Sequence, residues 1–242
     1  MKLRQKLFLA GLLMVIFTLS IVVLVKGDPV GGTILTNTTS TRGSTPDNRS
    51  DDGGTITTIT VDATQQNYAW KAYVGNISGT LVLDDSSGRS IYGWSLATLT
   101  GEIFATRSSS PSWSALSCAS NAVIASEQTV LTMSTSDIDS INHTFNETTH
   151  QTFTIAGNTL SQSTCRVAYP YVNDTFQTPS TTNYFQEILI NDTNQNLIYA
   201  SELEADKPGY IIGSSMDFQM IVPDNDEAGN QTTYFFYVEL GG

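Results

Sequence analysis

The sequence predicts an all-β domain of the β-sandwich type with one short helix, preceded by a transmembrane helix and a disordered stalk. Three observations lead to this prediction. From Ile59 onward, short runs of β-branched and aromatic residues alternate with turn residues. The final runs alternate apolar and polar side chains with period two, as strands with one buried face do. Ahead of them, an apolar run and then a polar stretch occupy residues 1–58.

The chain starts with a basic tail, residues 1–6, followed by the uncharged apolar run 7–25. At ~1.5 Å per residue, this run is roughly 28 Å long as a helix, close to the ~30 Å hydrocarbon core of a bilayer. Basic residues before an apolar segment indicate export with the N-terminus left in the cytoplasm. We therefore expect a single-pass signal-anchor, a cytoplasmic tail, and an extracellular location for everything after Lys26.

Two other interpretations of the apolar run stay open. A cleaved signal peptide has an apolar region of ~7–15 residues and a small-x-small cleavage site. The best candidate for that site, Val25-Lys26-Gly27, carries a lysine in the middle. A type IV pilin leader is cut just before the apolar helix, and the junction Gln5-Lys6-Leu7-Phe8 lacks the small residue that precedes such a cut. The retained anchor is the preferred interpretation.

Residues 26–58 predict a flexible stalk, because Gly, Pro, Thr and Ser dominate and few side chains there can be buried. A flexible chain of this length separates its ends by about 30 Å. Residues 59–242 are long enough to bury one core without a second domain. We expect them to form a single extracellular β domain.

Within this domain, period-two alternation and turn residues predict strands, and one segment predicts a helix. The strands are expected at 59–64, 68–74, 79–84, 91–97, 101–107, 121–125, 129–133, 151–156, 164–169, 184–190, 197–203, 209–213, 216–222 and 232–240. The helix is expected at 137–147, where a capping box begins at Ser136 and an apolar stripe runs from Ile138 to Phe145.

Two segments of equal length, Leu81–Leu96 and Ile188–Leu203, share one pattern. In each, three apolar residues lead to a polar turn that contains Asp85 or Asp192, followed by Ile-Tyr. Each segment predicts a β-hairpin. Duplication of a half-domain and convergence on a common hairpin pattern both explain the likeness.

The charge composition argues against nucleic acid as a partner. The chain has 23 acidic and 11 basic residues and a net charge of −12. Phosphate recognition needs a basic surface, and so does docking of a domain onto anionic lipid. We expect the acidic residues to keep an exposed domain soluble.

The two cysteines, Cys118 and Cys165, predict a disulfide, because an oxidising exterior favours pairing. The bridge would close a loop of about 48 residues, worth about 4 kcal/mol in the chain-entropy model. Two separate buried thiols are the alternative. Two cysteines do not suffice for a zinc site, and His143 and His150 do not form a metalloprotease helix motif.

Asn-x-Ser/Thr sequons mark eight candidate glycosylation sites, which in an exported glycoprotein are also expected at the surface. They are Asn37, Asn48, Asn76, Asn142, Asn146, Asn173, Asn191 and Asn230. Their occupancy depends on whether the organism has a surface N-glycosylation pathway.

The turn 224–230 holds the densest cluster of oxygen ligands. Asp224 and Asp226 take positions one and three of an EF-hand loop, but Ala228 and Phe235 stand at positions five and twelve. Calcium at Asp224 and Asp226 is therefore a weak candidate, and an ordinary polar turn is preferred. We expect no other metal site and no cofactor.

No residue is assigned a catalytic role, because neither a Gly-x-Ser-x-Gly elbow nor a phosphate-binding glycine loop occurs. The sequence favours a non-enzymatic role and leaves enzymatic activity open, since a carboxylate pair for glycoside hydrolysis has no local signature. Aromatic residues cluster in the first half of the domain and are expected mainly in the core, with an exposed platform as the alternative. They are Tyr68, Trp70, Tyr73, Tyr92, Trp94 and Trp113.

Two stretches resemble segments of uncharacterised, membrane-anchored cell-surface proteins of archaea. The first is Trp70–Leu96, and the second, near the end, consists of the two runs Asp217–Pro223 and Tyr234–Leu240. The resemblance covers most of 59–242; it implies a cell-surface location and no particular activity.

We expect a structural or adhesive surface module that contacts envelope glycans, neighbouring cells or copies of itself. The alternatives are a pilin-like filament subunit joined by strand complementation and an extracellular carbohydrate-active hydrolase.

Overall fold

The computed structural model describes residues 27–43, 46, 48–96, 98–225, 227 and 229–241. The predicted basic tail 1–6 and transmembrane helix 7–25 lie outside these residues. Across the described ranges, no helix is both long and apolar enough to cross a membrane. The domain is mostly β, as the sequence predicts.

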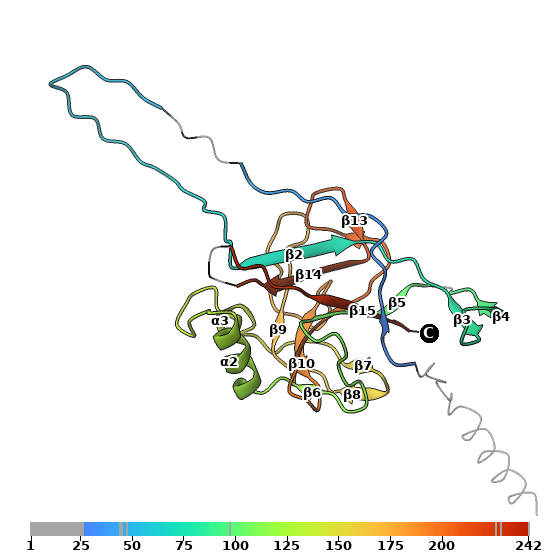
Figure 1. Cartoon of the computed structure of the whole chain (residues 1–242). Coiled ribbons are helices and arrows are strands. Elements are labelled where there is room, and N and C mark those ends of the chain that lie inside the picture. The colour runs from blue at the N-terminus through green and yellow to red at the C-terminus, as the bar shows by residue number, and fades with distance from the viewer. Residues whose placement is uncertain are drawn as a thin grey trace, which may run out of the picture.

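A seven-stranded antiparallel sheet forms the centre of the domain (Figure 1). Its strands follow the order β1-β15-β5-β11-β10-β6, and β9 pairs with the same edge of β10 as β6 does. The bounds are β1 Val30–Gly31, β5 Thr100–Thr106, β6 Ser117–Cys118, β9 Val167–Ala168, β10 Glu187–Asn191, β11 Leu197–Glu202 and β15 Phe235–Gly241. Strands β5 and β11 lie in the middle of this sheet, which explains why most of their side chains are buried.

Alternation along these strands divides the apolar side chains between two cores. Ile103 and Tyr199 face the first core, which is closed by the two-stranded sheet of β2 (Trp70–Gly75) and β14 (Phe218–Pro223). Two helices, α2 (Asn121–Val130) and α3 (Ile141–Thr144), add side chains to this core.

The second core lies on the opposite face of the sheet. Phe104 and Ile198 face it, and the hairpin of β7 (Phe153–Ile155) and β8 (Asn158–Leu160) covers them. Trp113 completes this core by packing against Phe104, with 5.0 Å between ring centroids. The middle strands of the sheet are therefore covered on both faces.

Two short strand pairs stand apart from these layers. The hairpin of β3 (Leu81–Asp84) and β4 (Ser90–Trp94) projects from one end of the domain (Figure 1). The other pair, β12 (Lys207–Pro208) and β13 (Ser215–Met216), precedes β14.

The largest departure from the predicted elements is helix α2, which replaces the strands expected at 121–125 and 129–133. Ser120 caps the helix by accepting a hydrogen bond from the backbone N–H of Val123. The buried residues Val123, Ile124, Glu127 and Gln128 recur at helical spacing. The β-branched residues in this segment favour a strand, but burial of this single stripe outweighs that preference.

The predicted helix 137–147 is shorter than expected. It is the single turn α3, and its cap is Ser140 rather than Ser136. Two further expected strands are absent: residues 59–64 are exposed and irregular, and residues 209–213 form a turn. Neither segment belongs to a sheet of the described structure, so the local pattern alone did not make them strands.

Part of the predicted stalk belongs to the sheet. Val30 and Gly31 form β1, which pairs with Val238 and Tyr237 of β15. The backbone N–H of Gly32 also donates to the carbonyl of Phe236 at 2.9 Å, and Pro29 is buried. The chain then leaves the sheet, and the described residues between 32 and 68 are exposed without regular structure before it returns at β2.

The two similar segments do form hairpins, and their turns share one hydrogen-bond pattern. The Oδ1 of Asp85 accepts from the N–H groups of Ser87 and Arg89, two and four residues ahead. Asp192 accepts from the two corresponding N–H groups, those of Asn194 and Asn196.

Beyond these turns, the two hairpins differ in register. Ile190 pairs with Ile198, whereas Leu83 skips Ile91 and pairs with Tyr92 at an irregularity beside Asp84. The two hairpins therefore have the same turn but a different pairing between their strands.

The disulfide Cys118–Cys165 is present, as predicted. Cys118 belongs to β6, which pairs with Ile190 and Asn191, and Cys165 lies two residues before β9, which pairs with Glu187 and Ile188. The bridge therefore joins two short strands that together cover the outer edge of β10. An exposed edge of this kind would otherwise be open to pairing with another chain.

We expect Cys118→Ser to lower the free energy of unfolding by about 2–4 kcal/mol, because the unfolded chain loses its cross-link. Urea unfolding of the full chain in detergent, followed by tryptophan fluorescence, measures the change. Reduction of the wild-type protein should reproduce the loss. An unchanged transition in both samples would show that the bridge does not stabilise the domain.

Candidate functional site

Neither histidine is placed for catalysis. The buried His150 holds the loop before β9, because its Nε2 accepts from the N–H groups of Thr164 and Cys165. Its Nδ1 therefore carries the proton and donates to the carbonyl of Gln151. Burial lowers the pKa of His150, in keeping with a neutral ring. The Nδ1 of His143 lies 2.7 Å from the carbonyl oxygen of Asp137, beside the cap of α3.

Asp224, the calcium candidate, is engaged within the protein. Its Oδ1 accepts from the N–H groups of Asn225 and Thr232 and lies 3.2 Å from the Nζ of Lys71. The pKa of Asp224 is lowered from its ordinary value. Burial alone would raise this pKa, but the hydrogen bonds from Thr232 and Asn225 and the charge of Lys71 outweigh the effect of burial. The other candidate, Asp226, lies outside the described residues. Over the described part of the chain, no group of three or more His, Cys, Asp or Glu residues is arranged to hold a metal ion.

Most sequons lie at the surface. The asparagines at 37, 48, 76, 146, 173 and 230 are exposed, and Asn142 is partly buried. Asn191 differs, because it is only 6% exposed within β10 and its amide donates to the carbonyl of Asp192. The expectation that every sequon marks the surface is therefore wrong at Asn191, where strand pairing buries the side chain.

The aromatic residues divide between core and surface. Trp113 is buried, and Trp70 packs beside Phe145 and donates its indole N–H to the carbonyl of Asp139. Trp94 and Tyr92 are exposed on the projecting hairpin, although their alternation predicts a buried face. The alternation is present, but no second layer covers this hairpin, so its face stays in solvent.

Five large apolar side chains are exposed on two loops that lie side by side. We call this surface the two-loop patch; it consists of Tyr171, Phe176, Tyr210, Ile211 and Ile212. These side chains are between 43% and 73% exposed. The rings of Tyr171 and Phe176 contact each other edge-to-face, with centroids 6.1 Å apart. Single exposed apolar side chains are ordinary, but a cluster of this kind indicates a contact surface.

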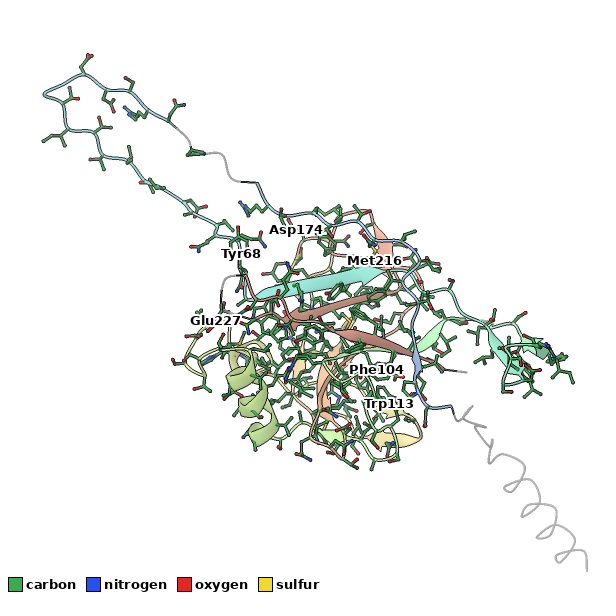
Figure 2. The ribbon with its side chains drawn as sticks, viewed as in Figure 1. Tyr68, Phe104, Trp113, Asp174, Met216 and Glu227 are labelled. Carbon is green, nitrogen blue, oxygen red and sulfur yellow. A yellow bond between two sulfur atoms is a disulfide. The ribbon has the colours of Figure 1, made fainter. Side chains whose placement is uncertain are left out.

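The two loops are fixed to each other by hydrogen bonds. The N–H groups of Asn173 and Asp174 donate to the carbonyls of Gly209 and Tyr210 at 2.8 and 2.7 Å. Asp174 lies on the first of these loops, and Met216 follows the second (Figure 2). The buried amide of Gln219 bridges the loops: it donates to the carbonyl of Tyr171 and accepts from the N–H of Tyr210. The two-loop patch is therefore preorganised, which lowers the entropy cost of binding.

A second unusual feature is a row of three carboxylates across the central sheet. Glu102 of β5 is paired directly with Glu202 of β11 on one side and with Glu239 of β15 on the other. Residues opposite each other in antiparallel strands project to the same face with Cβ atoms ~4.5–5.5 Å apart. We call these three residues the glutamate row. They lie on the face of the second core, where the N–H of Ala156 donates to Glu239 at 2.8 Å.

Each member of the glutamate row has a raised pKa. Burial, together with the charges of Glu239 and Glu202, raises the pKa of Glu102 well above its ordinary value of 4.5. Burial and the charge of Glu204 raise the pKa of Glu202 to about 7, against the lowering effects of Gln151 and Lys207. Burial and the charge of Asp28 raise the pKa of Glu239, although the N–H of Ala156 opposes this. The row therefore holds protons at a pH where isolated carboxylates are charged.

A polar hollow of about 160 Å³ lies elsewhere, beside helix α2. Arg107 and Glu127 line it, and they are already joined by two hydrogen bonds of 2.7 and 2.8 Å. The glutamate row does not line this hollow. Glu127 is the one carboxylate among the residues that line this hollow, so the hollow holds no carboxylate pair.

Neither a protein-family model, nor a curated protein, nor a solved structure matches this chain. The resemblance to archaeal surface proteins therefore stays a prediction.

The two-loop patch and the glutamate row were both missed from the sequence. Residues 209–213 are apolar and predict a strand, although glycines on either side of Tyr210–Ile212 indicate a turn. The glutamate row depends on the register between strands far apart in the chain, which no local pattern reveals.

We expect the glutamate row to make stability fall as pH rises from about 4.5 to 7. A carboxyl group whose pKa is raised by folding stabilises the folded state at a pH below its pKa in the unfolded chain. This stabilisation is lost as the pH rises through the pKa of the group in the folded state. Glu102→Gln removes the central charge and should raise the free energy of unfolding at pH 8 by about 1–2 kcal/mol, with no gain at pH 4.5.

Urea unfolding of the full chain at several pH values measures this difference. Asp62→Asn, at an exposed position, is the matched control and should leave the pH profile unchanged. A Glu102→Gln profile parallel to that of the wild type would contradict the interpretation.

Proposed function

We propose that this chain is a membrane-anchored surface protein whose β domain is a binding module for protein partners. Residues 7–25 would be the anchor, with the N-terminus cytoplasmic and the domain extracellular. The observation that carries the binding role is the two-loop patch, an exposed apolar surface on rigid loops. Rigid loops on a stable scaffold are a common location for binding residues.

The chemistry of the two-loop patch favours a protein surface over a sugar. Tyr171, Tyr210 and Phe176 offer aromatic surface of the kind found at binding hot spots. Ile211 and Ile212 have no group to hydrogen-bond with a sugar hydroxyl. A second copy of the chain is the simplest partner, because an apolar patch can meet its own equivalent across a two-fold axis.

The two alternative functions have less support. A filament joined by strand complementation needs a free terminal strand, but β15 already pairs with β5 along its length and with β1 at Tyr237 and Val238. A glycoside hydrolase needs two carboxylates exposed to substrate. The glutamate row is partly covered by the β7–β8 hairpin, and the N–H of Ala156 in the turn of this hairpin donates to Glu239.

We expect the native chain to stay in the membrane fraction after a high-pH wash, with an intact N-terminus. Its mass should exceed 26.2 kDa if the exposed sequons carry glycans. Detergent extraction followed by intact-mass measurement tests both. A chain that begins near Asp28 and is soluble, or one that begins near Leu7 in large assemblies, would contradict the anchor.

We expect Ile212→Asp to abolish the contact between copies, because it places a charge in the two-loop patch. Liposomes that carry the wild-type chain should aggregate, and the variant should reduce the initial rate of turbidity increase at least tenfold. Ile138→Asp is the matched control, since Ile138 is 92% exposed and lies outside the patch. Equal aggregation by both variants and the wild type, or none by any of them, would refute self-contact through this patch.

A further inference from the structure

The projecting hairpin, residues 81–94, is the most exposed apolar segment of regular structure in the described chain. Its side chains Val82, Leu83, Ile91, Tyr92 and Trp94 are between 44% and 80% exposed. The rings of Tyr92 and Trp94 contact each other with centroids 4.9 Å apart. A lone two-stranded hairpin is at best marginally stable in water. A hairpin with this much apolar surface therefore needs a partner.

The base of the hairpin lies at the C-terminal end of β15. Gly79, just before β3, is so close to Leu240 that a Cβ there would overlap the leucine side chain. After β4, Thr100 pairs with Gly241, and its hydroxyl donates to the Gly241 carbonyl at 3.0 Å. Both ends of the hairpin are therefore fixed beside residues 240 and 241.

The N-terminal part of the chain joins the domain at the same end. Strand β1 runs antiparallel to β15 with Val30 opposite Val238, so Asp28 lies at the level of Leu240. The charge of Asp28 also raises the pKa of the neighbouring Glu239. Gly27 and Asp28 therefore lie at the end of the sheet from which the hairpin projects (Figure 1).

The sequence before β1 sets the distance to the membrane. The apolar run ends at Val25, and residues 26–29 separate it from Val30. Five residue steps of extended chain span at most ~18 Å. Headgroup layers add roughly 5–8 Å on each side of the hydrocarbon core. An anchor at 7–25 thus holds this end of the sheet close to the bilayer surface.

We propose that the projecting hairpin lies in the interfacial layer of the same bilayer, with Tyr92 and Trp94 at headgroup level. This inference rests on the proposed membrane anchor. Tyrosine and tryptophan are the residues enriched at membrane interfaces, because their rings are apolar and their tips are polar. Leu83 pairs with Tyr92 and therefore shares its face, so it adds apolar surface that leaves water on contact.

Charge decides which property of the lipid matters. The hairpin turn carries Asp84, Asp85 and Arg89, and the whole chain has a net charge of −12. Anionic lipid would not attract such a surface. The contact therefore depends on apolar and aromatic burial, and we expect it to occur on zwitterionic lipid and to withstand salt.

Fluorescence quenching by brominated phosphatidylcholine tests this placement. The full chain is reconstituted in vesicles of this lipid, and the same vesicles without bromine give the reference. Quenching of the wild-type emission should be at least twofold greater than that of Trp94→Phe, and 0.5 M NaCl should not change it. Trp70→Phe is the matched control and should keep the wild-type quenching, because Trp70 packs in the domain beside Phe145.

Flotation of the same vesicles separates the two proposals. If the chain does not float with the vesicles, the anchor fails and the inference fails with it. If the chain floats but Trp94→Phe is quenched as much as the wild type, only the hairpin placement is refuted. Emission that is insensitive to bromine but shifts to the blue as the protein-to-lipid ratio rises would identify a second copy as the cover, and would also overturn the inference.

Discussion

Strand β15 lies between β1 and β5, and its pairing with both strands determines how one end of the domain is built. The last strand of the chain pairs with β5 over seven residues, from Phe235 opposite Thr106 to Gly241 opposite Thr100. Gly101 makes the end of this pairing possible, because its φ is +120° and a Cβ there would overlap the carbonyl of Glu239. Through this pairing, one end of the sheet receives the C-terminus, the base of the projecting hairpin and the incoming N-terminal segment.

The same pairing has an electrostatic cost. It places Glu239 beside Glu102, which already faces Glu202 across β11. Like charges directly opposite each other destabilise a sheet. The raised pKa values show how the fold accommodates the row, since protons neutralise part of the charge and the N–H of Ala156 satisfies one carboxylate. His150 has the opposite dependence, because its lowered pKa favours folding above its ordinary value of 6.5.

Much of the sheet could be predicted because its strands carry period-two alternation, and β5, β10, β11 and β15 lie within or close to their expected ranges. The disulfide could be predicted from the cysteine count and the expected oxidising compartment. Helix α2 was missed because Val123, Ile124 and Val130 are β-branched, and the helical spacing of its buried residues outweighs this preference only in the folded domain.

The exposure of side chains was less predictable than the secondary structure. Trp94 alternates like a core residue, and only the absence of a covering layer in the described structure leaves it in solvent. Contacts between distant strands, such as Glu102 with Glu239, depend on register and have no local signal.

The balance of energies at β1 connects the fold to the proposed location. Pairing β1 with β15 closes a loop from Gly32 to Tyr68, which costs about 3 kcal/mol of chain entropy. The pairing forms a few hydrogen bonds, each of which stabilises the folded domain by roughly 0.5–1.5 kcal/mol, and it buries Pro29. These amounts nearly cancel, so the pairing of β1 adds little net stability to the domain. Contact between the projecting hairpin and the bilayer would further stabilise the arrangement in which β1 is paired with β15. Release of β1 would instead free residues 26–58 to act as the stalk that their composition predicts.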